Sequence, residues 1–354
     1  MNKRVSIQYY FVFSLFIIWV LIIPTTLTAC SSFILQDSTQ ILLAKNLDWE
    51  INNGIILINK KGVLKTAYGD NQQKFSWTSN YGSVTFNQFG KEFPLGGMNE
   101  KGLVIEELNS WGETPDYNNN KYQMNEFQWT QFCLDNYSNV EELLEFIDSI
   151  VIVPLFINLH YLISDSYGNS VIVEFYNRKR YLYKDVNLPY PILTNNHYNN
   201  SLKYLSNFKG FGGKMEIRPY NTSNERFVKI ASMIKIQGNK NTNENFAFQI
   251  LDSVSQSDTQ WSIVYNISNK SIQFKTLQNK SIKTIDLAHL DFSCNTPTSF
   301  IEVINGKNFK ELKPDDNKKL LMDVFDKYTY YNLGKVSKKE FLNLVDYGNS
   351  IKCQ

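Results

Sequence analysis

Alternating apolar and polar positions dominate the chain after its first thirty residues and predict short strands separated by turns. Runs of branched and aromatic residues are bounded by clusters of Gly, Asn, Asp and Ser, which is the pattern expected of strands and hairpins. Where two such runs flank a short polar cluster, a hairpin is predicted. The predicted segments are a hairpin at 31–43, a strand at 54–59, a turn at 96–102 followed by a strand at 103–105, and hairpins at 159–175 and 260–276.

Helical periodicity is confined to a few segments. Ser138 to Glu141 has the pattern of a capping box ahead of an apolar run. Residues 224–234 place apolar side chains at helical spacing. Two further helices, charged and amphipathic, are predicted at 314–331 and 336–344.

Strands that alternate with few, longer helices predict an α+β fold of stacked antiparallel sheets covered by helices. We expect residues 30–300 to form one such domain. Residues 301–354 are predicted to be a helical extension that packs on this domain and does not form a second one.

The first residues of the chain have the pattern of an export signal. Lys3 and Arg4 precede an apolar run at 9–23, which Pro24 ends because proline cannot continue a helix. This run is shorter than the roughly 20 residues needed to cross a bilayer, which argues against an uncleaved membrane anchor. Residues 1–29 are therefore predicted to be a signal peptide, and the rest of the chain to be secreted or periplasmic.

The predicted cut follows the small residue Ala29 and makes Cys30 the new amino terminus. Two chemistries place a cysteine there. Residues 27–30 resemble the bacterial lipobox, whose cysteine is lipidated and anchors a lipoprotein. An amino-terminal nucleophile hydrolase requires instead that the thiol and the amine stay free. The signal segment alone does not decide between these alternatives.

Composition excludes several classes of protein. The 36 basic and 34 acidic residues nearly balance, which argues against a nucleic-acid partner. The signal carries two basic residues and no acidic one, so the chain without it is formally neutral. Hydrophobic residues at 43% exclude disorder. Four cysteines are too few for a disulfide scaffold, although Cys294 and Cys353 could pair in an oxidising compartment. With three histidines, no metal or organic cofactor is implied.

An amino-terminal Cys30 would carry both a nucleophile and a base. An α-amine has a pKa near 7.7–8.0 and a thiol near 8.5, so the amine can accept the thiol proton close to neutral pH. Attack on an amide carbonyl then requires donors for the oxyanion and a charged group that orients the amine. Asp48, Asn109, Asn195 and Arg226 offer these groups, but their types alone do not distinguish them from other polar residues.

Several ordered motifs resemble the choloylglycine hydrolase family of linear amide C–N hydrolases. Cys30-Ser31-Ser32-Phe33, followed by Ala44-Lys45-Asn46-Leu47-Asp48-Trp49, resembles the beginning of the family domain. Each motif is weak alone, but their common order over residues 30–276 is specific. The later matching segments are Gly97–Leu103, Leu159–Asp165, Val171–Glu174, Leu193–Asn195, Glu225–Phe227 and Thr259–Ser262.

The resemblance implies a four-layer αββα sandwich of the amino-terminal nucleophile type, with Cys30 as the nucleophile. It also implies that Asp48 orients the amine and thiol and that Arg226 lies close to the cysteine. Asn109 and Asn195 resemble the pair that holds the oxyanion and substrate. The chain departs from the family at Lys45, where arginine is frequent; lysine keeps the charge but loses the planar two-pronged donor.

The resemblance further implies an amidase of the EC 3.5.1 type that acts on a small-molecule N-acyl amide. Penicillin V, conjugated bile acids and fatty acyl amides are the expected substrate classes. Lys45, Trp49 and Trp111 are expected to contact the substrate, because aromatic side chains beside the site favour an apolar acyl group. Family members often assemble as tetramers, so a homo-oligomer is expected, without stable membrane contact unless Cys30 is lipidated.

Two other hypotheses stay open at this point. The first is a lipid-anchored protein of the same fold that binds ligands without hydrolysing them. The second is a conventional Cys–His hydrolase that uses Cys133 with His160 or His197. The sequence signatures that accompany such pairs in known families are absent, and Cys133 and His160 have the pattern of buried structural residues.

Overall fold

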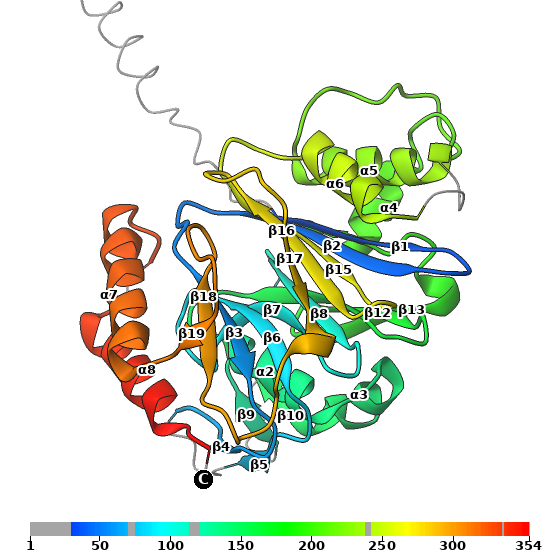
Figure 1. Ribbon diagram of the computed structural model, residues 1–354. Helices are drawn as coiled ribbons and strands as arrows, with labels where there is room; N and C mark the ends of the chain where they lie inside the picture. The colour runs from blue at the N-terminus through cyan, green and yellow to red at the C-terminus, as the bar shows by residue number, and fades with distance from the viewer. Residues whose placement is uncertain (1–29, 70–74, 113–120, 238–241, 335, 354) are drawn as a thin grey trace, which may run out of the picture.

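The computed structural model describes residues 30–69, 75–112, 121–237, 242–334 and 336–353. The predicted signal peptide therefore lies outside the described residues. Two large antiparallel sheets form the centre of the molecule (Figure 1). The six-stranded sheet has the order β14-β1-β2-β15-β16-β17. Its strands are β1 (Ser31–Gln36), β2 (Ile41–Asp48), β14 (Ile192–Thr194), β15 (Thr259–Asn266), β16 (Ser271–Thr276) and β17 (Lys283–Asp286).

The second sheet has nine strands in the order β13-β12-β11-β8-β7-β6-β3-β18-β19. Two small two-stranded sheets, β4-β5 and β9-β10, lie outside it. The nine strands are β3 (Ile55–Asn59), β6 (Ser83–Asn87), β7 (Pro94–Asn99), β8 (Val104–Asn109), β11 (Leu159–Ser164), β12 (Ser170–Tyr176), β13 (Lys179–Lys184), β18 (Ser299–Glu302) and β19 (Lys310–Glu311). The small sheets use β4 (Leu64–Thr66), β5 (Ser76–Thr78), β9 (Tyr122–Met124) and β10 (Ile150–Ile152).

Helices cover the outer faces of both sheets, which completes a four-layer αββα arrangement (Figure 1). On the six-stranded sheet, α5 packs against β14 and β1, and α6 packs against β2 and β15. On the nine-stranded sheet, α2 packs against β7 and β8. The helices of these layers are α2 (Glu126–Asn136), α3 (Val140–Phe146), α4 (Tyr198–Leu205), α5 (Ser223–Gln237) and α6 (Glu244–Ser253).

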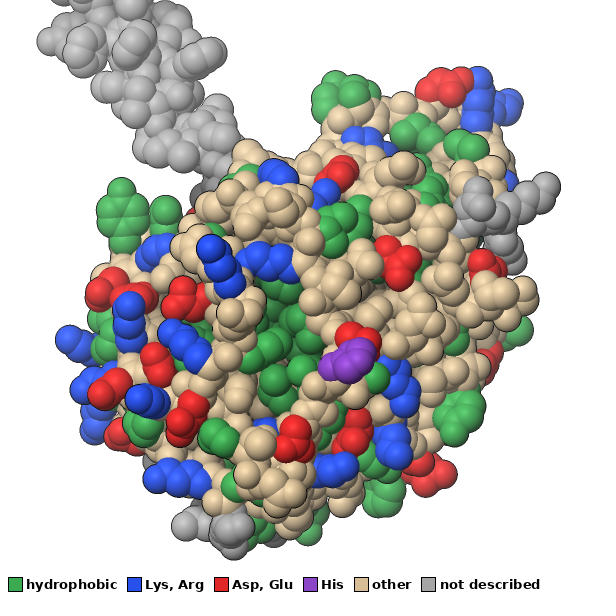
Figure 2. Space-filling view, in the orientation of Figure 1, with side chains coloured by type: hydrophobic (Ala, Val, Ile, Leu, Met, Phe, Trp, Pro, Cys, Tyr) green, Lys and Arg blue, Asp and Glu red, His purple; other side chains and the backbone are tan. Residues whose placement is uncertain are grey.

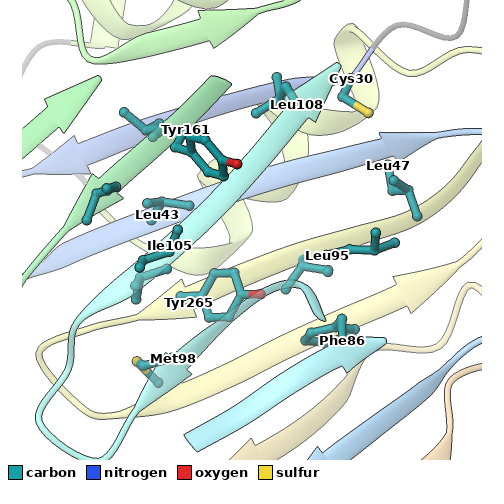
Figure 3. Packing of buried hydrophobic residues seen from close by; sticks show 14 of the residues in the cluster. Cys30, Leu43, Leu47, Phe86, Leu95, Met98, Ile105, Leu108, Tyr161 and Tyr265 are labelled. Atoms are coloured by element: carbon teal, nitrogen blue, oxygen red, sulfur yellow. The ribbon is translucent and has the colours of Figure 1, made fainter. Parts of the chain in front are cut away.

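The main hydrophobic core fills the space between the two sheets (Figure 3). Leu43 from β2 and Tyr265 from β15 face Met98 from β7 and Leu108 from β8, and all four are buried. Strand alternation explains this, because every second side chain of a strand points to the same face. Figure 3 places Cys30 at the margin of this core, beside the end of the strand that carries Leu108.

The predicted hairpins are confirmed, and the differences lie at element boundaries and in helices that the sequence pattern missed. The turn predicted at 96–102 is wrong in its first half, because Gly96 to Asn99 continue β7 and only Glu100 and Lys101 form the turn. The predicted cap is displaced by one residue: the Asn139 side chain accepts from Glu142 N, while Glu142 accepts from Ser138 N and Oγ. The sequence pattern also missed α2, α4 and α6.

The C-terminal extension consists of α7 (Pro314–Tyr330) and α8 (Lys338–Ser350), which pack on each other and on one side of the domain (Figure 1). Figure 2 shows Lys, Arg, Asp and Glu side chains crowded over this region. A disulfide between Cys294 and Cys353 joins the end of the extension to the domain. The sequence allowed this pair, and the structure shows it.

Candidate active site

Cys30 directly precedes β1 and lies at one end of the inter-sheet space. Its side chain is buried and lines a pocket of about 180 Å³ together with Lys45, Asp48 and Asn109. The thiol Sγ lies 3.9 Å from the backbone carbonyl of Asp48. Four residues that the sequence assigned to the site are thus brought together, although 79 positions separate Cys30 from Asn109 along the chain.

Asp48 is the last residue of β2, and its carboxylate is held by uncharged donors. Thr259 Oγ1 donates to Oδ1 at 2.5 Å, and Gln256 Nε2 donates to Oδ2 at 2.9 Å. Burial raises the pKa of Asp48 from its ordinary 3.8 to about 6, against the opposing effect of Arg226. The carboxylate is therefore fixed in position and only partly compensated.

Arg226 reaches from α5 to the start of β1 and fixes the backbone of the cysteine. Its Nη1 donates to the carbonyl of Cys30 at 2.6 Å and to Ser31 Oγ at 2.5 Å. The same nitrogen lies 3.8 Å from Asp48 Oδ2. Burial lowers the pKa of Arg226, although Asp48 opposes the change. The guanidinium thus fixes the backbone of Cys30. Its shortest hydrogen bonds go to two uncharged oxygens, the Cys30 carbonyl and Ser31 Oγ.

Asn195 and Asn109 are connected directly. Asn195 follows β14, and its Nδ2 donates to the backbone carbonyl of Asn109 at 2.9 Å, while its Oδ1 accepts from Arg226 Nη2 at 3.1 Å. Asn109 ends β8, which brings the nine-stranded sheet to the pocket beside the six-stranded one. An amide nitrogen carries two hydrogens, so the Asn195 contact with Asn109 uses only one of them.

Lys45 is buried beside the Cys30 pocket, close to the carboxylates of Glu106 and Glu107. Its Nζ lies 2.6 Å from Glu106 Oε2 and donates to the carbonyl of Leu95 at 2.9 Å. Burial lowers the pKa of Lys45, but Glu106, Cys30 and Glu107 outweigh this effect and raise it. At this position, where arginine is frequent in the family that the sequence resembles, the lysine pairs with Glu106. It therefore stays charged beside the thiol.

Glu107 is a pocket residue that the sequence did not single out. Its side chain is 3% exposed and lines the pocket, and Oε1 has no hydrogen-bond partner within the described part of the chain. Thr130 Oγ1 donates to the other oxygen at 3.1 Å. Burial raises the pKa of Glu107 well above its ordinary value, against the effect of Lys45. A buried acidic side chain with one oxygen that has no hydrogen-bond partner among the described residues therefore faces the pocket.

Apart from Gln88, the rest of the pocket lining is apolar and includes three phenylalanines. Phe89 stacks on Phe127 with ring centroids 4.8 Å apart, and Phe156 lies 4.7 Å from Phe89. Glu126 accepts hydrogen bonds from the backbone of Leu155, Phe156 and Ile157, which holds this segment in place. The further apolar lining residues are Leu47, Leu95, Ile157, Leu159, Tyr328 and Leu333.

The two tryptophans expected near the substrate have different environments. Trp49 lines the pocket, and its indole Nε1 is buried without a hydrogen-bond partner among the described residues. Trp111 is 50% exposed and is absent from the described lining of this pocket. A contact of Trp111 with substrate stays a prediction that the position of its side chain does not support.

The thiol of Cys30 is not activated while its nitrogen is part of a peptide bond. Burial raises its pKa from the ordinary 9.0 to about 11, and Lys45 only partly opposes this. A neighbouring base is therefore needed before the thiol can act as a nucleophile near neutral pH.

The alternative Cys–His pair does not assemble. Cys133 lies on α2, against the outer face of the nine-stranded sheet, where Tyr161 OH donates to the α2 carbonyl of Glu126. His160 is the neighbour of Tyr161 in β11, so it points to the opposite face of the sheet. There it contacts Glu174 at 3.2 Å, which also contacts His197 at 3.3 Å. Burial raises the pKa of Cys133 well above its ordinary value.

Neither a cluster of metal-binding side chains nor a membrane-spanning helix occurs among the described residues. No group of three or more His, Cys, Asp or Glu side chains in this part of the chain is arranged to hold a metal ion. Within the same ranges, no helix combines the length and apolar character that a membrane crossing needs.

Comparison with known families and sequences gives two matches. The family model of the linear amide C–N hydrolases, choloylglycine hydrolase family, matches residues 30–300. The chain is also similar to a penicillin V acylase of Pectobacterium atrosepticum, with 24% identity over 316 residues. That alignment covers 75% of this chain and 82% of the relative.

Solved structures show the same fold. The chain is similar to a penicillin V acylase from Agrobacterium tumefaciens, with a TM-score of 0.70 and 23% identity, covering 80% of this chain and 98% of that one. It is also similar to a mutant conjugated bile acid hydrolase from Clostridium perfringens, with a TM-score of 0.63 and 20% identity. The second match covers 80% of this chain and 96% of the other. These matches confirm the predicted α+β sandwich.

Proposed function

This chain belongs to the choloylglycine hydrolase family of linear amide C–N hydrolases, and we propose that it is an exported N-acyl amidase with Cys30 as its amino-terminal nucleophile. One observation carries the proposal. The buried Cys30 thiol lines an apolar pocket while Arg226 and Asp48, both buried, fix the backbone and charge around it.

Cleavage before Cys30 would supply the missing base. The new α-amine accepts the thiol proton, and its ammonium form is attracted to the Asp48 carboxylate, which has only uncharged donors in close contact. The thiolate then attacks the amide carbonyl and forms a tetrahedral intermediate. Its collapse breaks the C–N bond, the leaving amine takes the proton, and water later releases the acyl group from Cys30.

The oxyanion of the intermediate requires nearby donors. Asn195 Nδ2 has a hydrogen beyond the one directed at the Asn109 carbonyl, and the Asn109 side chain borders the same pocket. Arg226 contributes indirectly, because it holds both Asn195 and the carbonyl of Cys30. We assign it a positioning role.

The lining of the pocket supports an apolar acyl group. Phe89, Phe127 and Phe156 offer aromatic surface in the same pocket as the Cys30 thiol. Penicillin V, a glycine-conjugated bile acid and a long-chain acyl homoserine lactone carry three different apolar acyl groups and form the test panel. If all three are inert while short peptides are cleaved, the apolar-acyl assignment is wrong.

The disulfide between Cys294 and Cys353 supports export, because such bonds persist in oxidising compartments. The competing proposal is a lipoprotein with Cys30 acylated. It follows from the lipobox-like residues before Cys30, and it is incompatible with catalysis because an acylated amine cannot act as a base.

Mass spectrometry of the mature chain, combined with substitution of Cys30, tests the proposal. We expect an unmodified amino-terminal Cys30 and a loss of turnover of at least about a thousandfold in Cys30→Ser. Cys133→Ser is the matched control and should keep wild-type turnover, since that buried thiol lies on the outer face of the nine-stranded sheet. A diacylglyceryl mass on Cys30, or full activity of Cys30→Ser, would exclude the mechanism.

A further inference from the structure

Part of the pocket wall comes from the C-terminal extension. Tyr328 on α7 and Leu333 in the following loop line the same pocket as Cys30. The family match ends at residue 300, so both side chains lie outside the matched region. The wall they form therefore lies outside the region that the family model matches.

The local backbone holds these two side chains together. Leu333 N donates to the Tyr328 carbonyl at 3.1 Å, and Asn332 has a φ of 52°, in the left-handed region that turns the chain back. At Gly334 an added Cβ would lie 2.3 Å from the Tyr328 hydroxyl. A larger residue at this position would displace the Tyr328 ring, so glycine favours the close approach of the loop to the tyrosine.

Aromatic contacts connect this wall to the rest of the pocket. Phe156, itself a lining residue, lies 6.2 Å from Tyr328 and 5.7 Å from Phe341 on α8, measured between ring centroids. Phe341 also lies 6.4 Å from Phe89, a second lining residue. Both helices of the extension thus pack directly behind the side chains that shape the pocket.

Polar and covalent contacts fix the extension at its far end. Tyr347 OH donates to the Thr66 carbonyl at 2.6 Å, and Lys91 Nζ donates to the carbonyl of Ile351 at 2.5 Å. The Cys294–Cys353 disulfide follows immediately and closes the attachment. A segment held this firmly can act as a rigid limit on what the pocket admits.

We propose that the C-terminal extension is the acyl-specificity element of this enzyme. Tyr328 and Leu333 set the largest apolar acyl group that fits beside Cys30, and the disulfide keeps this wall in position. The inference rests on the proposed function, because it concerns the same pocket. It adds that the specificity of this chain depends on residues beyond its family domain.

Opposite changes at Leu333 test the size limit. N-Acyl glycines with straight chains from butanoyl to hexadecanoyl provide the series, and kcat/KM is measured for each. Leu333→Ala enlarges the pocket and should raise the ratio of long-chain to short-chain kcat/KM by about tenfold, whereas Leu333→Trp should lower it by about tenfold. Tyr330→Ala is the control, because Tyr330 lies on α7 close to Tyr328 in sequence but is 82% exposed. Its length profile should match the wild type.

A binding assay separates failure of this inference from failure of the proposed function. Calorimetric titration of fatty acids of the same lengths into Cys30→Ser, with and without each Leu333 substitution, requires no turnover. If the wild type hydrolyses none of the amides, the proposed function fails. The order of fatty-acid affinities by chain length still tests whether Tyr328 and Leu333 limit the size of the bound chain. If both Leu333 variants keep the wild-type length order in binding, the inference is overturned.

The role of the disulfide is tested with the double variant Cys294→Ser, Cys353→Ser. We expect a flatter length profile with the short-chain kcat/KM unchanged within about threefold, since the nucleophile and its partners lie in the domain. A length profile identical to the wild type would show that the disulfide does not hold the wall.

Discussion

Two buried groups of opposite charges differ in how completely they are paired. In the Lys65 group, Nζ of Lys65 lies 2.7 Å from Glu92 and 2.9 Å from Asp135, and Trp77 Nε1 donates to Asp135 at 2.8 Å. In the Asp48 group, the nearest cation is Arg226 Nη1 at 3.8 Å. Both groups are almost inaccessible to solvent.

We expect this difference to separate a structural cluster from the proposed catalytic site. The Lys65 group is complete by itself and fastens β4 to α2. Asp48 has neutral donors in close contact, and burial, which Arg226 only partly opposes, raises its pKa to about 6. The α-ammonium of a mature Cys30 would supply the absent charge.

Isosteric substitution of one carboxylate in each group is the strongest test of this comparison. Asp48→Asn should lower kcat/KM by about 10²–10⁴-fold, because the amine loses its orienting charge, with little loss of stability. Asp135→Asn should lower the free energy of unfolding, because it weakens a buried ion pair. The kcat of the folded enzyme should stay unchanged. Steady-state kinetics and urea unfolding of both variants measure the two effects. Equal effects of the two substitutions on both quantities would contradict the distinction.

Removing the cation of the Lys65 group should produce the largest change in stability. Lys65→Met leaves Glu92 and Asp135 buried without compensation, and we expect a loss of about 3–5 kcal/mol in the free energy of unfolding. Lys61→Met is the control: its ion pair with Glu100 is solvent-exposed, so its loss should cost at most about 1 kcal/mol. Denaturant unfolding measures both. A Lys65→Met loss as small as that of the control would mean that the group is not structural.

The sequence predicted the polar half of the pocket much better than the apolar half. Cys30, Asp48 and Arg226 occur in short motifs whose order resembles the choloylglycine hydrolase family, and this resemblance identified them. Phe156 and Tyr328 have no such signal, because any buried aromatic has the same local pattern. Only the three-dimensional packing shows which apolar side chains reach the nucleophile.

The same limit applies to the charges and to the fold. Lys45 was singled out because it lies in the motif that contains Asp48. Its partner Glu106 lies on the facing sheet, and sequence spacing does not show a contact between sheets. Hairpins were predicted because period-two alternation and turn residues are local signals. Helix α2 was missed because buried Gln, Thr and Asp interrupt its apolar pattern. The expectation that 301–354 packs on the domain was useful, but its contact with the pocket was not foreseen.

The pH dependence of stability provides the smallest and most selective test of the comparison. In a chain with residues retained before Cys30, the folded pKa of Asp48, about 6, exceeds its ordinary 3.8. The folded state therefore keeps the proton longer than the unfolded state. The free energy of unfolding, measured relative to that of Asp48→Asn, is therefore highest below pH 4. As the pH rises to about 6.5, this difference should fall by at most about 3 kcal/mol, because each pKa unit corresponds to 1.36 kcal/mol.

In the mature chain, the ammonium of Cys30 should lower the folded pKa of Asp48 and shrink this fall. The matched measurement is urea unfolding of the retained and mature forms, each with Asp or Asn at position 48, at pH 4 and pH 6.5. The Lys65 group acts equally in both forms and cancels in the difference. If the two forms show the same fall, the new amine does not interact with Asp48. The distinction between the two buried groups would then reflect burial alone, without any role for processing at Cys30.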